Sequence, residues 1–259
     1  MSRKIVVTSG KGGVGKTTLT ASLGKKLADA GNRVVLCDVD FGLNNLDVTC
    51  GVENRVVYDL TDVVEGRCRV RQALIDVDGN GNFFILPSSH SLGKNRIGAQ
   101  HVRLVVDSLK NAFDYILIDC PAGIDAGFHR AVALADEAIV VTTPHLSSLR
   151  DADKVISVLA SYQMQKVGLV VNRARGDLIL DGQMASPEEI ESLLKVSLIG
   201  VIPEEDGVFL HPFARSGGAN KAFQMLCNVI RGKRGGVYNC TAKYSGFFGS
   251  IKRSLRRTV

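Results

Sequence analysis

The chain has 259 residues, 45% of them hydrophobic and 22% charged, which suffices for the core of one domain or at most two small ones. A mean hydropathy of +0.11 excludes a disordered chain, and no uncharged apolar run approaches the roughly 18 residues of a membrane-spanning helix. The net charge of +6 is uneven, because ten of the 32 basic residues follow Asp206, the last acidic residue. The first five residues do not resemble a signal peptide, so we expect a cytoplasmic protein. The six cysteines form no CxxC pair, which disfavours zinc and iron–sulfur motifs.

Apolar runs alternate with helical patterns along the chain. Most runs are continuous, as in strands buried on both faces of a parallel sheet. The predicted strands are Ile5–Thr8, Val34–Asp38, Phe83–Leu86, Tyr115–Asp119, Ala138–Thr142, Val167–Asn172 and Leu198–Val201. The predicted helices are Lys16–Ala30, His101–Asn111, Leu149–Ser161 and Pro187–Lys195. This order predicts a single α/β domain, with a doubly wound, mostly parallel sheet flanked by helices.

A glycine-rich loop lies between the first strand and the first helix. Residues 10–17, GKGGVGKT, match the phosphate-loop pattern G-x-x-x-x-G-K-[ST] at every fixed position. Successive backbone N–H groups and a helix N-terminus would surround phosphates, Lys16 would reach the β- and γ-phosphates, and the Thr17 hydroxyl would ligate Mg²⁺. The predicted phosphate-binding residues are Gly10, Lys11, Gly12, Gly13, Val14, Gly15, Lys16, Thr17 and Thr18. The loop therefore predicts a P-loop NTPase.

Acidic residues follow two of the predicted strands. Asp119 ends an apolar strand, where P-loop enzymes place the carboxylate that holds Mg²⁺ directly or through water. Asp38 and Asp40 stand one residue apart after the second strand, so their side chains point the same way. One of the two could support the metal shell and the other could orient the attacking water. Residues 120–125 are a candidate switch segment that responds to the γ-phosphate.

Because it has a second lysine, Lys11, the loop resembles that of the deviant Walker A family of ATPases. Three further stretches make this resemblance more specific, because they resemble the MinD family of septum-site-determining ATPases. These are residues 37–47, 121–125 and 200–204. That resemblance implies that Lys11 reaches the nucleotide of a second protomer, that Asp40 assists the hydrolytic water and that Asp38 lies near the metal. It also implies that Asn172 binds adenine and that Pro203 closes the adenine pocket. The expected catalytic residues are thus Lys11, Lys16 and Asp40, and the expected metal ligands are Thr17, Asp38 and Asp119. One departure is Asn44, where the family often carries Arg.

The end of the chain is basic and amphipathic. A glycine-rich basic stretch at residues 231–236 predicts a break, so we divide the chain into an ATPase domain (1–230), a flexible linker (231–243) and a membrane-targeting helix (244–259). At 100° per residue the apolar and basic side chains of the last segment separate onto opposite faces, as in helices that lie in a membrane interface. The predicted membrane contacts are Tyr244, Phe247, Phe248, Ile251, Lys252, Leu255 and Arg256. Two alternatives stay open: a helix docked on the protein's own core, and a basic arm that binds nucleic acid.

The resemblance implies a function, with two rivals. It implies a slow Mg²⁺-dependent hydrolysis of ATP to ADP and phosphate, an ATP-dependent homodimer, and peripheral binding to anionic lipids on the inner face of the cell membrane. Its partners would be a MinC-type division inhibitor and a MinE-type activator, with no nucleic acid. The rivals are a flagellar-number ATPase (FlhG-type), which usually has an N-terminal extension, and a DNA-partition ATPase (ParA-type). The apolar stripe of the tail argues against the second rival.

Overall fold

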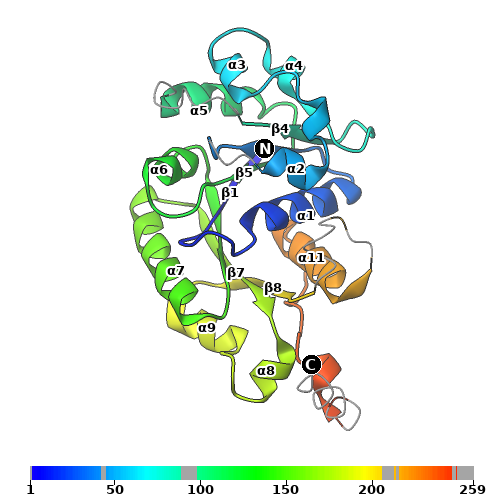
Figure 1. The fold of residues 1–259 in the computed structure, drawn as a ribbon, viewed down its shortest axis with the longest axis vertical. Coiled ribbons are helices and arrows are strands. Elements are labelled where there is room, and N and C mark those ends of the chain that lie inside the picture. The colour runs from blue at the N-terminus through cyan, green and yellow to red at the C-terminus, as the bar shows by residue number, and fades with distance from the viewer. Residues whose placement is uncertain are drawn as a thin grey trace.

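An eight-stranded sheet forms the centre of the computed structural model, which describes residues 2–41, 45–88, 98–205, 213, 216–246 and 249 (Figure 1). The strand order is β3-β4-β2-β5-β1-β6-β7-β8, and every neighbouring pair is parallel except β3 and β4. The strands are β1 (Arg3–Thr8), β2 (Val34–Asp38), β3 (Ile75–Asp76), β4 (Phe83–Leu86), β5 (Tyr115–Asp119), β6 (Glu137–Thr142), β7 (Lys166–Ala174) and β8 (Leu198–Pro203).

Helices cover both faces of this sheet and bury two hydrophobic clusters. One cluster joins β1 to the first helix through Val7 and Leu23, and the other joins β1 to a later helix through Val6 and Phe128. On the first face lie α1 (Lys16–Asp29), α2 (Leu46–Cys50) and α11 (Gly217–Ile230), with α1 and α11 side by side (Figure 1). On the other lie α3 (Leu60–Val64), α5 (Ala99–Ser108), α6 (Ala126–Val132), α7 (Leu146–Leu159) and α9 (Pro187–Leu194). Helices α4 (Val70–Ala73) and α8 (Gly176–Leu180) are short.

The predicted fold class is confirmed. All seven predicted strands are present, and Ser186 begins α9 with a capping box that it forms with Glu189, as the Ser-Pro-Glu-Glu sequence predicts. The sequence analysis missed the antiparallel edge strand β3, the long helix α11 and the shorter helices α2, α3, α4, α6 and α8. Helix α11 opens with two glycines, which weaken its helical signal, although its apolar face is buried against α1 and β8.

The topology places a switch point at the carboxyl ends of the central strands. Strand β1 pairs with β5 on one side and β6 on the other. The strands that precede β6 in the chain, β2 to β5, therefore lie on one side of β1, and β6, β7 and β8 lie on the other. Ligands of open α/β sheets bind at such a switch point, outside the carboxyl ends of the strands.

The chain after α11 runs as extended backbone to a 3₁₀ turn, η4 (Ala242–Tyr244), beside α8 (Figure 1). Cys240 and Tyr244 are buried, 3% and 4% exposed. The proposed division into domain, linker and tail stays a prediction, since six of the seven expected membrane contacts, from Phe247 onward, lie outside the described residues. Within the described residues, no helix is both long and apolar enough to cross a bilayer.

Candidate nucleotide-binding site

The glycine-rich loop follows β1 and opens α1 at the switch point. Gly13 and Gly15 have φ angles of +76° and +95°, the left-handed region that favours glycine. Gly10 is needed for a different reason: a Cβ there would lie 2.2 Å from the carbonyl oxygen of Asp151 in α7. The loop is therefore packed against α7 and aims its N–H groups, with the N-terminus of α1, at one point.

The two lysines of the loop occupy different environments. Lys16 is 8% exposed, and its Nζ donates a hydrogen bond to Ser9 Oγ at 3.0 Å. Lys11 is exposed, and its Nζ donates to Ser147 Oγ, in the first turn of α7, at 3.1 Å. Sequence reasoning missed both serines, although Ser9 directly precedes the loop. The Lys16 ammonium group faces into the loop, as expected of a cation that binds a ligand there. The Lys11 ammonium group faces outward, as expected of a cation that binds a neighbouring molecule.

Two buried carboxylates stand side by side under the loop. Asp38 and Asp119 end β2 and β5 and are partners in the register of these parallel strands. Burial raises the pKa of Asp119 to about 6, against the opposing effect of a hydrogen bond with Thr17 and the nearby charge of Lys16. Burial, and next the charge of Asp119, hold the pKa of Asp38 well above its ordinary value. A divalent cation beside the two carboxylates would favour their charged forms.

The donor set fits Mg²⁺. Among the described residues no group of three or more His, Cys, Asp and Glu side chains could hold a metal alone. Mg²⁺, however, is usually bound by one or two carboxylates together with substrate phosphates and water. Thr17, Asp38 and Asp119 could supply that protein share, and a divalent cation there would offset the charge repulsion that raises the pKa of Asp38. Asp40 is half-buried, and its backbone N–H donates to Asp38 Oδ1 at 2.9 Å, so it lies at the edge of the pair.

The residues expected around adenine lie at the ends of β7 and β8. Asn172 Nδ2 donates a hydrogen bond to the carbonyl oxygen of Val14 in the loop, at 2.7 Å. Pro203 is buried and pairs with Ala174 in the register of the two strands. Thr18 lies in the first turn of α1. The structure thus brings Asn172 to the loop, while its contact with adenine stays a prediction. Asn44 and the tail residues Phe247, Phe248, Ile251, Lys252, Leu255 and Arg256 lie outside the described residues.

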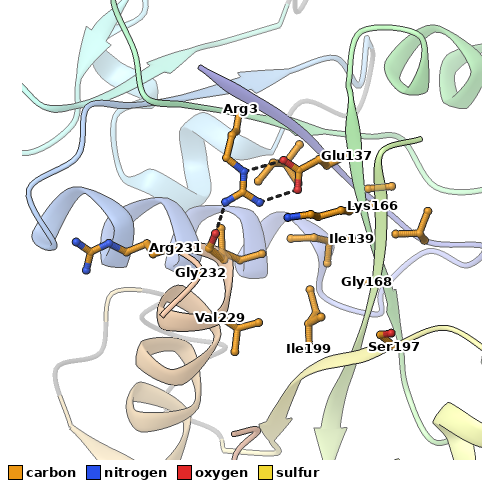
Figure 2. A pocket seen from close by; sticks show the side chains of 14 residues that line it. Arg3, Glu137, Ile139, Lys166, Gly168, Ser197, Ile199, Val229, Arg231 and Gly232 are labelled. Carbon is orange, nitrogen blue, oxygen red and sulfur yellow. Dashed lines mark hydrogen bonds and ion pairs between the residues drawn. The ribbon is translucent and has the colours of Figure 1, made fainter. Parts of the chain in front are cut away.

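A hollow of about 490 Å³ lies at the opposite edge of the sheet, near the amino ends of β1, β6 and β7 (Figure 2). Its main charged groups are already paired: Arg3 Nε donates to Glu137 at 2.7 Å, and Arg3 Nη1 donates to the carbonyl oxygen of Ile230. The sequence analysis did not identify this hollow. Because its ion pair is complete without a ligand, we regard it as a structural feature rather than the nucleotide site.

Comparison with known proteins agrees with this geometry. The AAA domain family matches residues 2–169. The septum site-determining protein MinD of Synechocystis sp. is 50% identical over 210 residues, which cover 81% of this chain and 79% of that protein. The chain belongs to the MinD family of septum site-determining proteins. In the MinC:MinD cell division protein complex of Aquifex aeolicus, a chain with 39% identity superposes with a TM-score of 0.83, covering 90% of this chain and 97% of that one.

A second solved structure of a MinD protein bears on the loop. The septum site-determining protein MinD of Pyrococcus horikoshii, described as complexed with Mg-ADP, is 31% identical, has a TM-score of 0.77, and is matched over 89% of this chain and 96% of its own. Membership of the MinD family and the phosphate loop, with its buried lysine and neighbouring carboxylates, identify this chain as a P-loop ATPase. ATP and Mg²⁺ are the ligands that the site fits.

Proposed function

We propose that the chain is a Mg²⁺-ATP-dependent dimerising ATPase that binds the cytoplasmic face of the cell membrane through its C-terminal segment and helps to position the division septum. The observation that carries the proposal is the contrast between the two loop lysines. Lys16 is buried beneath the loop, whereas Lys11 presents an exposed ammonium group beside the N-terminus of α7. An exposed cation on a phosphate-binding loop is suited to the phosphates of a second protomer.

We assign each residue of the site a separate role in ATP hydrolysis. Lys16 and the loop N–H groups bind and orient the β- and γ-phosphates, and Thr17, Asp38 and Asp119 hold Mg²⁺. When bound there, Mg²⁺ would neutralise charge on the phosphate oxygens. Asp40, at the edge of the carboxylate pair, orients the attacking water. As the family resemblance implies, turnover should be slow until a MinE-type activator completes or rigidifies the site. The MinC chain in the Aquifex complex supports a MinC-type inhibitor as the recruited partner.

Substitution of Lys11 tests the dimer. Lys11→Ala should bind ADP like the wild type, because the loop N–H groups and Lys16 are intact, but should stay monomeric with ATP in light scattering. Lys154→Ala is the matched control, since Lys154 is also an exposed lysine associated with α7 and pairs only with Asp151 nearby. Asp40→Ala should give the converse result, a lasting ATP dimer with turnover about a hundredfold slower. A stable ATP dimer of Lys11→Ala would refute the proposal.

The membrane step follows from the dimer. One tail would bury about four large apolar side chains at roughly 1.5–3 kcal/mol each, and folding the segment offsets much of that gain. A single tail is therefore marginal, whereas two tails held in one dimer gain from their effective concentration. Hydrolysis would separate the protomers and return them to the cytoplasm.

Sedimentation with anionic vesicles tests this step. Deletion of residues 247–259 should abolish ATP-dependent sedimentation and leave nucleotide binding unchanged. Phe248→Glu should have nearly the same effect, because it places a carboxylate on the apolar face. Arg256→Gln should weaken binding modestly and reduce its salt dependence, since one of several screened charges is lost. Wild-type binding by Phe248→Glu, with binding lost on charge removal, would make the tail a basic arm and remove the membrane from the proposal.

A further inference from the structure

Residues 237–246, here called the C-terminal arm, are docked on α8 by a backbone contact. A Cβ at Gly176, the first residue of α8, would lie 2.0 Å from the carbonyl oxygen of Cys240 and 3.0 Å from Thr241 Cα. Only glycine allows this approach. Cys240 and Tyr244 are nearly fully buried in the docked arm. The arm is thereby held to one place on the domain.

Side chains around the docked arm come from the ends of three other elements. Arg175 Nη2 donates to Asp177 Oδ2 at 2.5 Å, and this bond, followed by smaller effects of neighbours that include Glu204 and Tyr244, raises the pKa of Arg175. Lys243 lies 3.9 Å from Glu205, whose carboxylate oxygens also accept hydrogen bonds from the Gly218 and Ala219 N–H groups of α11. The arm therefore meets the ends of β7 and β8 and the start of α11.

A short stretch of β7 joins this arm site to the phosphate loop. Asn172 is bonded to the Val14 carbonyl oxygen of the loop, and Gly176, four positions later, contacts the arm. Between them Arg173 has a φ of +56°, which is unfavourable for a residue with a side chain, and the pairing with β8 shifts register between Val171 and Ala174. A strained, irregular connection of this kind can adopt a second arrangement when one of its ends changes partner.

We propose that binding of adenine releases the C-terminal arm from α8. This inference rests on the proposed function, in which Asn172 binds adenine. Adenine offers a donor and an acceptor to the Asn172 amide, whose Nδ2 donates to the Val14 carbonyl oxygen and whose Oδ1 accepts from the Arg173 N–H. When the amide turns to present both groups to the base, it gives up these two bonds, and the path of residues 173–176 changes. That change disturbs the backbone contact between Gly176 and Cys240. The nucleotide base frees the arm and its tail, whereas the γ-phosphate brings two protomers together.

Hydrogen exchange with two probes tests the proposal on the full chain. Mg²⁺-ADP carries the base but should not drive dimerisation, and Mg²⁺-pyrophosphate fills the phosphate loop without a base. Saturating Mg²⁺-ADP should speed exchange of the amides of residues 240–245 about fivefold, and pyrophosphate should leave them unchanged. ADP binding without faster exchange, or an equal effect of pyrophosphate, would overturn the coupling alone. Failure of ADP to bind would overturn the nucleotide site as well.

A glycine pair supplies the reciprocal test. Gly176→Ala displaces the arm, so by linkage it should bind Mg²⁺-ADP about fivefold more tightly, with exchange at residues 240–245 already fast. Gly236→Ala is the matched control, because nothing lies within 4 Å of a Cβ at that position. If Gly176→Ala does not fold, Tyr244→Ala, which removes the buried ring of the arm, replaces it. Wild-type ADP affinity in a variant whose arm exchanges fast would refute the proposal.

Discussion

The charged residues at the amino ends of the strands, here called the amino edge, and those at the carboxyl ends, the carboxyl edge, differ in their partners. At the amino edge the charges are paired within the protein: Arg3 with Glu137, and the nearly buried Lys4 with Asp107 and Asp136. At the carboxyl edge two carboxylates, Asp38 and Asp119, are buried against each other and their pKa values are raised. We call the first edge complete, because these ion pairs lie within the protein, and the second incomplete, because the charge of Lys16 does not bring the pKa of Asp119 back to its ordinary value. The hollow in Figure 2 lies at the complete edge, so a hollow alone identifies a ligand site less well than unbalanced charge does.

The largest expected effect is at the incomplete edge. Lys16→Ala should weaken Mg²⁺-ATP binding by at least about a hundredfold, because it removes a buried charged donor to the phosphates. Calorimetric titration measures this loss. The unfolding midpoint without nucleotide should stay close to that of the wild type, since Lys16 bonds only to Ser9 among the hydrogen bonds of its side chain described here. Wild-type affinity would show that the loop is not the site.

The complete edge should give the converse result. Glu137→Gln removes the carboxylate that pairs with Arg3 and should destabilise the fold by about 2 kcal/mol, less than for a fully buried pair because Arg3 is partly exposed. Urea unfolding measures the change. ATP affinity at 25 °C should be unaltered; a large loss of affinity in a folded variant would mean that the two edges are coupled.

Asp119→Asn should stabilise the protein without nucleotide at neutral pH, by about 3 kcal/mol. The folded pKa of about 6 exceeds the ordinary value of 3.8, so between these pH values the folded chain holds a proton that the unfolded chain has lost. Stability therefore falls as pH rises through this window, and the full penalty applies above pH 6. The gain from Asp119→Asn should fade toward pH 4, and Mg²⁺-ATP should no longer protect the variant from thermal unfolding. Equal stability of the two proteins across the window would contradict the pKa assignment.

The smallest effect should come from an exposed charge, even where it lies close to a carboxylate of the amino edge. Arg103→Gln removes an exposed helix pair with Asp107, at 3.8 Å, and should change stability by less than about 0.5 kcal/mol. Thermal unfolding checks this value and sets the background against which Glu137→Gln and Asp119→Asn are judged. A loss as large as that of Glu137→Gln would show that exposure does not separate the two kinds of pair.

The local parts of the site were predictable from sequence, and the long-range contacts were not. The loop at residues 10–17 and the strand ending at Asp119 each carry their signal within a few residues, so their positions were found. The bond from Asn172 to Val14 joins residues 158 positions apart, and the contact of Gly176 with Cys240 joins two segments with no shared pattern. Tyr244 fits the apolar stripe of a tail helix, yet it is buried in a 3₁₀ turn beside α8, because the docking site comes from distant strands. Its role at a membrane stays a prediction.

The pairing of Asp38 with Asp119 also restricts where this protein can accept an inserted residue. Side chains alternate between the two faces of a strand, so one extra residue within β2 or β5 would turn its aspartate to the opposite layer of helices. Insertions of a single residue should therefore be eliminated in these two strands even where hydrophobicity is preserved. The turn at residues 78–82, between β3 and β4, is under no such constraint, since it is exposed and only its ends are held by the sheet. A library of one-residue insertions, selected for ATP binding, should show depletion at the two central strands and tolerance at that turn.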